Sequence, residues 1–259
     1  MKKFSVLEVL YPIGLYYLVS GFVFFALNIL LGESQEIYML KQLISSGATI
    51  PFLTSFWKQD MYIEKVVYGT EKQSLSQRML QIVLTCISAG AFGVALNNFI
   101  AMTPLIDVSA GFQNANTNFF AGVFWLEVLA SCVVVPVAEE LLFRGIILKR
   151  TSMMAGERMG ILCSALLFGV IHMNLVQFIY ATIIGAFLAM IVVKTKKLYL
   201  AMIGHGAANL IAVLRVETGM LDFSYEADML GIGFTLLMAV IGIITAGALL
   251  KQDTKESQL

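Results

Sequence analysis

Charged residues are scarce in this sequence. Only 13% of its 259 residues are Asp, Glu, Lys or Arg, whereas 59% are hydrophobic. A soluble domain carries about 25% charged residues, and half that supply cannot cover a soluble globule. Most of the surface must therefore face a lipid bilayer, in keeping with a mean hydropathy of +0.84. The formal net charge is zero, which gives no reason to expect nucleic acid as a partner.

Cysteine is rare as well. The three cysteines, Cys86, Cys132 and Cys163, lie in apolar stretches without CxxC spacing. This pattern argues against a disulfide framework or a zinc knuckle and favours small buried side chains. Internal repeats are also missing from the sequence, although transporters usually have them.

Long apolar segments account for most of the chain, and a helix needs about 20 such residues to cross the bilayer. Eight segments can be marked off, at residues 9–31, 37–57, 79–103, 118–148, 159–173, 176–193, 198–214 and 230–250. The second is the weakest because it contains Lys41, Gly47 and Pro51, and it could lie partly along the interface. The sequence predicts an all-α, polytopic membrane helix bundle of about eight transmembrane helices, forming a single domain over residues 1–259.

The positive charges indicate the orientation of this bundle. Placing the N-terminus inside puts 14 of the 17 Lys and Arg residues in the cytoplasm and leaves only Arg215 in an outside loop. Lys41 and Arg144 fall within segments. Such an asymmetry favours this orientation and an even number of crossings. We therefore expect a multi-pass protein of the cell membrane with both termini in the cytoplasm.

Three charged residues interrupt the fourth segment, in the sequence VVVPVAEELLFRGIILKR. Each charge at the centre of a membrane helix costs about 2.5–3.5 kcal/mol, so Glu139, Glu140 and Arg144 are expected to face the protein interior. Glu140 and Arg144 are four residues apart and can pair on one helix face. Glu139 points about 100° away, and its less compensated carboxylate is a candidate general base. Pro136, one turn earlier, is expected to kink the helix beside Glu139.

The only two histidines lie in the fifth and seventh segments. His172 follows Phe168 by four residues and His205 precedes Asn209 by four, so each pair shares a helix face. By helix rise, Glu139, His172 and His205 lie roughly 12–20 Å from the predicted cytoplasmic face. We expect segments four to seven to bring them together in one polar pocket within the membrane.

Each of these groups also has a structural interpretation. A lone membrane Glu or His can be a packing residue, Glu140 with Arg144 a structural ion pair, and Asn209 a tie between helices. The structural interpretations are less plausible when they are taken together. Five polar or charged side chains on three helices each add a free-energy cost of membrane insertion, which is a poor way to stabilise a bundle. We interpret the other polar residues within segments as structural or interfacial: Asn28, Asn97, Asn98, Glu127 and Gln177.

The patterns EExxxR, FxxxH and HxxxN, in this order on successive segments, resemble the CPBP family of CAAX proteases and bacteriocin-processing enzymes, also called Abi proteins. Here they are Glu139–Arg144, Phe168–His172 and His205–Asn209, and all three match without departure. The resemblance covers residues 118–214, which are expected to form the protease core. The eight-helix plan also suits the family.

The resemblance implies an intramembrane endopeptidase with six catalytic-site residues: Glu139, Glu140, Arg144, His172, His205 and Asn209. It implies that Glu139 with His172 activates a water molecule. His205 and Asn209 would stabilise the tetrahedral oxyanion, with the Glu140 and Arg144 pair supporting the site. Phe168 is expected to contact the substrate.

A second mechanism stays open, with a divalent metal such as zinc bound by Glu139, His172 and His205. Two imidazoles and one carboxylate with an open position form a known catalytic zinc set. The HExxH helix of zincins is absent from the sequence, so the ligands would have to come from three helices. The sequence therefore leaves a metal-free glutamate mechanism and a metalloprotease as alternatives.

The resemblance also bears on the substrate. Enzymes of this type trim prenylated CAAX proteins in eukaryotes, but the short loops and minimal core here look more like a bacterial member. A peptide precursor, such as a bacteriocin, or another membrane protein is then the expected substrate. Two other functions are alternatives to the protease: a catalytically silent regulatory or immunity protein that binds a membrane partner, and an ion-coupled transporter.

Overall fold

The computed structural model describes residues 4–68 and 74–252, and every regular element within them is a helix. Lys2, Lys3, Lys72 and Lys255, four of the predicted inside charges, lie outside the described residues. Helices match all eight predicted segments: α1 (Val6–Leu31), α2 with α3 (Tyr38–Gly47 and Ile50–Tyr68), α4 (Leu75–Ala101), the helix α7–α9 (Phe124–Ala155), α10 (Glu157–Val170), α11 (Leu175–Thr195), α12 (Leu198–Thr218) and α13 (Met229–Gln252).

Five of the described helices, α1, α4, α11, α12 and α13, are long and apolar enough to cross a membrane. A sixth span results if the short helix α6 (Ala110–Phe119) and the helix α7–α9, which meet at 115°, count as one broken span. The second predicted segment is divided into α2 and α3, so its weak hydropathy corresponds to a break. The chain is a polytopic membrane protein.

Capping residues explain where several of these helices begin and end. Ser5 and Glu8 form a capping box before α1, in which each side chain accepts a hydrogen bond from the other residue's backbone N–H. The Asn174 side chain accepts the N–H of Gln177 at the start of α11. At the end of α12, Gly219 takes a left-handed conformation with φ of 68°, which glycine adopts without strain.

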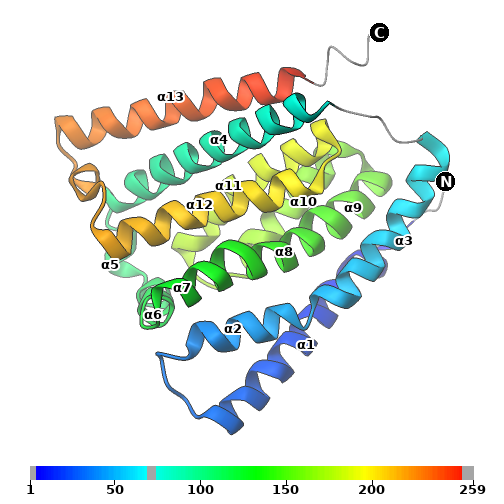
Figure 1. The fold of residues 1–259 in the computed structure, drawn as a ribbon, viewed down its shortest axis with the longest axis horizontal. Coiled ribbons are helices and arrows are strands. Elements are labelled where there is room, and N and C mark those ends of the chain that lie inside the picture. The colour runs from blue at the N-terminus through cyan, green and yellow to red at the C-terminus, as the bar shows by residue number, and fades with distance from the viewer. Residues whose placement is uncertain (1–3, 69–73, 253–259) are drawn as a thin grey trace.

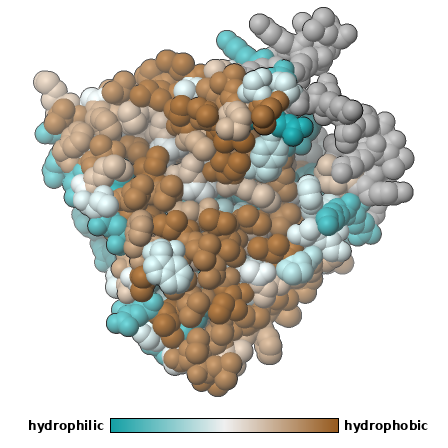
Figure 2. All heavy atoms as spheres, viewed as in Figure 1, coloured by the Kyte–Doolittle hydropathy of each residue, from teal (hydrophilic) through white to brown (hydrophobic). Residues whose placement is uncertain are grey.

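The helices lie side by side in a bundle from which α1, α2 and α3 diverge as an arm (Figure 1). On one side α4 packs between α12 and α13, and α10 packs against α11. The start of α1 and the end of α13 lie at the same end of the bundle. Apolar side chains cover most of the face seen in Figure 2, whereas hydrophilic residues gather towards the two ends.

Two clusters of buried side chains hold the bundle together. One joins α1, α3 and α10 around Leu142 and Phe143, next to the EExxxR sequence. The other joins α4, α11, α12 and α13 around Leu188 and Leu200. Small buried residues of α12, such as Gly204, allow its neighbours to approach closely, which is how membrane helices pack without a hydrophobic driving force.

The prediction that Arg215 lies in a loop is wrong. The sequence placed it in an outside loop, but it lies in the last turn of α12 and is only 1% exposed. Its Nη2 donates to Asn98 Oδ1 at 2.7 Å and to Ser224 Oγ at 3.0 Å, and its guanidinium lies 3.9 Å from the centroid of the Tyr225 ring. Asn98, interpreted from sequence as an isolated structural residue, is therefore one partner of a buried arginine.

Candidate active site

The EExxxR sequence of the helix α7–α9 begins in a short α-helical stretch and continues into a π-helical one, and a second π-helical stretch precedes it. The two π-helical stretches are η1 (Val128–Val134) and η2 (Leu141–Ile147), and they flank the short α-helical stretch α8 (Val135–Glu140). Such π-helical turns inside α-helices are frequent at functional sites, because the extra residue in the turn re-aims the side chains around it. Pro136 lies in the first turn of α8, directly after η1, and the kink expected beside Glu139 stays a prediction.

Glu140 joins Arg144 and His205 in one buried network. Its Oε1 accepts hydrogen bonds from Arg144 Nη1 at 2.8 Å and from His205 Nδ1 at 2.9 Å. The expected ion pair between Glu140 and Arg144 is thus present, with both side chains fully buried. A carboxylate can only accept, so His205 carries a proton on Nδ1, and its Nε2 is left to face the site. Glu140 therefore orients His205, a role that the i, i+4 spacing did not predict.

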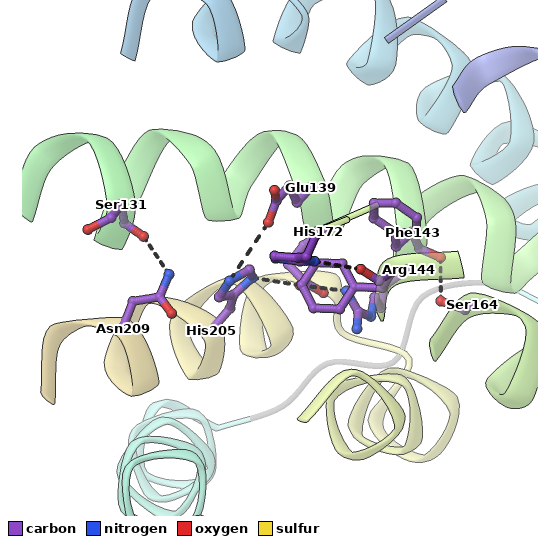
Figure 3. A network of polar contacts seen from close by, with 10 residues as sticks. Ser131, Glu139, Phe143, Arg144, Ser164, His172, His205 and Asn209 are labelled. Carbon is purple, nitrogen blue, oxygen red and sulfur yellow. Dashed lines mark hydrogen bonds and ion pairs between the residues drawn. The ribbon is translucent and has the colours of Figure 1, made fainter. Parts of the chain in front are cut away.

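Glu139 is the accessible member of the two adjacent carboxylates. Its side chain is 12% exposed, against 0% for Glu140, and its Oε2 lies 3.8 Å from His205 Nε2. Figure 3 shows the two side chains pointing towards one another from α8 and α12. At 3.8 Å the two groups are too far apart for a direct hydrogen bond, but they face the same small region of the site.

His172 lies just beyond the C-terminal end of α10. Its Nδ1 donates to the backbone oxygen of Phe168 at 2.8 Å, which leaves Nε2 as the free nitrogen. The imidazole is close enough to Glu139 for their charges to interact. The Phe168 ring stands edge-on to both histidines, with ring centroids 5.1 Å from His172 and 5.5 Å from His205.

Phe168 was expected to contact the substrate, but its side chain is buried. Its side chain is only 2% exposed, and the Arg144 guanidinium lies 4.3 Å from its ring centroid, a cation–π contact. Gly185 of α11 makes room for both groups, since a Cβ there would lie 2.7 Å from Arg144 Nη2 and 3.0 Å from Phe168 Cδ1. Phe168 is thus a buried spacer that separates the two imidazoles and covers the arginine.

Asn209 completes the network from α12. Its Nδ2 donates to the backbone oxygen of Ser131 in η1 at 2.8 Å, so it ties α12 to the helix that carries Glu139. His205 lies one turn away on the same face of α12 (Figure 3). All six polar residues expected at the site are therefore close to one another, and α8, η2, α12 and the end of α10 supply them.

Gly206 sets the distance between α12 and η1. A Cβ at this position would overlap the carbonyl oxygen of Cys132, which belongs to the backbone and cannot turn away. We expect Gly206→Ala to push α12 outwards, carrying His205 and Asn209 with it. Because a displacement of about 1 Å can cost about 100-fold in rate, peptide cleavage should fall by about that factor. Gly247→Ala in α13, where a Cβ meets nothing within 4 Å, should cleave at the wild-type rate. Equal rates for the two variants would contradict the prediction.

Sequence reasoning missed two tyrosines of α1 that lie beside the site. Tyr16 belongs to the buried cluster that contains Ala138 and Leu142, and both Tyr16 and Tyr17 are close enough to Glu139 for its charge to act on them. Tyr16 is buried, whereas Tyr17 is 43% exposed. An aromatic residue in an apolar segment looks the same in sequence whether it faces lipid or a carboxylate, so no signal pointed to them.

The metal alternative can be tested against the donor groups. Each imidazole has one nitrogen fixed by the protein, as histidine ligands usually do, and Glu139 faces His205. Within residues 4–68 and 74–252, however, no three His, Cys, Asp or Glu side chains gather closely enough to hold a metal ion. The residues as placed do not fit a three-ligand metal centre.

Comparison with known proteins agrees with this site. Residues 120–211 match the family model described as type II CAAX prenyl endopeptidase Rce1-like. The matched stretch is shorter than half of the chain, but it contains all six polar residues of the site. No curated protein and no solved structure matches. Residues 120–211 are thus similar to the CAAX proteases, and this similarity supports an intramembrane peptidase of that general type.

Proposed function

We propose that the protein is an endopeptidase in which Glu139 and His172 activate a water molecule, while His205 and Asn209 stabilise the oxyanion. The observation that carries this proposal is the position of Glu139. It is the partly exposed carboxylate, and it faces the free nitrogen of a histidine whose other nitrogen is held by Glu140. Peptide hydrolysis needs such a base, together with donors where negative charge develops.

In the proposed reaction, Glu139 takes a proton from water as the water oxygen bonds to the peptide carbonyl carbon. The electron pair of the C=O bond moves to the oxygen, which accepts hydrogen bonds from His205 Nε2 and Asn209 Nδ2. The C–N bond then breaks, and the proton held by Glu139 passes to the leaving amine. His172 Nε2 orients the attacking water, because Nδ1 is already occupied by the Phe168 carbonyl.

Charge balance supports this division of roles. For His205 to donate through Nε2, the imidazole must carry protons on both nitrogens, and its Nδ1–H already points at Glu140. With Glu139 and Glu140 ionised and Arg144 and His205 charged, the four side chains sum to zero. Moving one proton from His205 to Glu139 leaves that sum unchanged. A buried site can therefore hold the proton on either group without an uncompensated charge, which would be costly in a membrane.

The proposed substrate is a peptide precursor or a membrane protein, cut near the cytoplasmic side of the bilayer. The asymmetry of Lys and Arg supports this side, because it places both termini in the cytoplasm. The estimated depth of Glu139, His172 and His205 then puts the scissile bond roughly 12–20 Å from the cytoplasmic face. Substrate would enter from that face or laterally from the inner leaflet.

The test is cleavage of membrane-anchored peptides by the purified protein in lipid vesicles, with products identified by mass spectrometry. We expect the wild type to cut at least one peptide of a panel that includes prenylated CAAX peptides and unprenylated precursors. His172→Ala and Glu139→Gln should cleave at least about 100-fold more slowly. Product in equal amounts from all three proteins would overturn the proposal. The alternative, a catalytically silent protein that binds a membrane partner, requires a cellular phenotype that both variants retain.

Metal removal separates the two mechanisms left open by the sequence. We expect cleavage to continue at the wild-type rate after chelation and dialysis, because Glu139 can take the proton from water directly. Elemental analysis of the same sample should find less metal than protein on a molar basis. Activity that disappears with chelation and returns with zinc would overturn the metal-free mechanism and leave the peptidase assignment intact.

A further inference from the structure

Pro136 lies one turn before the two adjacent carboxylates and has no backbone N–H to donate. A residue at this position normally donates to the carbonyl four residues back in an α-helix, or five back in a π-helix. Those two carbonyls belong to Cys132 and Ser131. Pro136 is itself buried in the bundle, so water does not readily replace the missing donor.

The hydrogen bonds around Pro136 show which backbone carbonyl lacks an N–H donor from its own helix. The preceding N–H, that of Val135, donates to the oxygen of Ala130, five residues back. In that π-helical pattern the next donor, residue 136, would serve the oxygen of Ser131, and proline cannot. The Ser131 oxygen instead accepts the Asn209 side-chain amide at 2.8 Å. The π-helical turn and the proline together free one backbone acceptor that faces α12.

The same relation occurs at the other proline inside a helix. Pro12 lies within α1, and the carbonyl four residues earlier belongs to Glu8. That oxygen accepts Arg150 Nη1 at 2.6 Å, from a residue 142 positions away in sequence. The two remaining prolines, Pro51 and Pro104, lie at helix beginnings, where a donor is not required. Each proline inside a helix therefore has its missing bond replaced by a side chain from another helix.

We propose that Pro136 is a positioning residue that acts on Asn209 through the Ser131 carbonyl. The inference rests on the proposed function, in which Asn209 donates to the oxyanion. One N–H of the amide is held by Ser131, which fixes the plane of the side chain and hence the direction of the second N–H. An amide that is already oriented needs no reorganisation when negative charge develops on the substrate.

The test is a double-mutant cycle on peptide cleavage, comparing the wild type, Pro136→Ala, Asn209→Ala and the double variant. Alanine restores an N–H that competes for the Ser131 oxygen. We expect kcat to fall about 10-fold to 100-fold in Pro136→Ala with KM unchanged, and about 100-fold to 1,000-fold in Asn209→Ala. The double variant should match Asn209→Ala within about two-fold. Equal effects of Pro136→Ala with and without Asn209 would overturn the proposal.

Stability separates positioning from a general disturbance. An alanine in place of a proline inside a helix restores a backbone hydrogen bond, so the melting temperature of Pro136→Ala should equal or exceed that of the wild type. Pro136→Gly restores the same N–H, and the cycle is repeated with it so that the result does not depend on one variant folding. Pro12→Ala, the matched control, should keep kcat within about two-fold.

Failure of this inference differs from failure of the proposed function. If Glu139→Gln and Asn209→Ala are inactive but Pro136→Ala and Pro136→Gly cleave like the wild type, Pro136 has no positioning role and the inference is overturned. If Glu139→Gln and Asn209→Ala both cleave like the wild type, the proposed function fails, and the inference fails with it.

Discussion

Replacing Glu139 with glutamine is expected to lower kcat about 100-fold to 10,000-fold, the range that a positioned general base contributes. Glutamine has nearly the same shape but cannot take a proton from water. The substrate should still bind, so KM should change little. Because the substitution removes a charge from a site only 12% exposed, the melting temperature should not fall. The measurement is single-turnover cleavage of a membrane-anchored peptide in vesicles, with thermal unfolding of the same sample.

Glu127→Gln is the matched control for this prediction. Glu127 is also a buried glutamate on the helix α7–α9, but it lies by the bend near Gly122, about 18 Å along the helix from Glu139. It belongs to none of the hydrogen bonds around Glu140 and His205. Its glutamine variant should cleave within about two-fold of the wild type. Wild-type cleavage by Glu139→Gln would exclude Glu139 as the base. Equal losses in both variants would mean that the assay reports folding and not proton transfer.

Local contacts in this site could be predicted from sequence because they depend only on helix periodicity. The pair of Glu140 and Arg144 and the shared face of Phe168 and His172 both follow from spacing of four residues, and both occur in the structure. The eight apolar segments also correspond to helices. Helix periodicity does not predict how far one helix is rotated relative to its neighbour. That rotation decides which residue of the neighbouring helix lies opposite each polar side chain.

The contacts between helices therefore escaped prediction. The bond from His205 to Glu140 joins residues 65 positions apart, and the bond from Asn209 to Ser131 joins residues 78 positions apart. Both depend on the π-helical stretches around α8, which shift the register of every side chain after them. A single sequence shows a proline at 136 but not that the turn before it is π-helical.

Arg215 is a residue for which counting basic residues gave a wrong prediction. Counting basic residues treats every arginine near the end of a segment as solvated, and Arg215 was placed outside for that reason. The structure buries it against Asn98, Ser224 and Tyr225, because α12 continues to Thr218, past the end of the predicted segment at residue 214. Composition alone cannot distinguish a buried arginine from a loop arginine, since the partners come from α4 and from the short 3-10 helix η3 (Asp222–Tyr225).

Arg144→Met is expected to destabilise the protein by about 3–5 kcal/mol, the usual cost of removing one partner of a buried ion pair. Methionine keeps the packing against Phe168, because its sulfur makes favourable contacts with aromatic rings. The loss therefore comes from the charge of Glu140, which would remain fully buried and keep, among the described residues, the hydrogen bond from His205 alone. In thermal unfolding, a change of this size should lower the melting temperature by on the order of 10 °C.

The double variant Glu140→Gln with Arg144→Met distinguishes the cost of a buried charge from the loss of packing. Removing both charges should restore most of the stability, since buried ion pairs can often be replaced by neutral side chains of similar volume. Cleavage should stay low, because a neutral residue at 140 weakens the hydrogen bond that orients His205 for its proposed role at the oxyanion. Glu157→Gln breaks the pair of Glu157 and Lys196, whose side chains are 60% and 63% exposed, and should change stability by less than about 1 kcal/mol. If the double variant is as unstable as Arg144→Met, then Arg144 stabilises the bundle through its packing, and the charge of Glu140 is not what makes its loss costly.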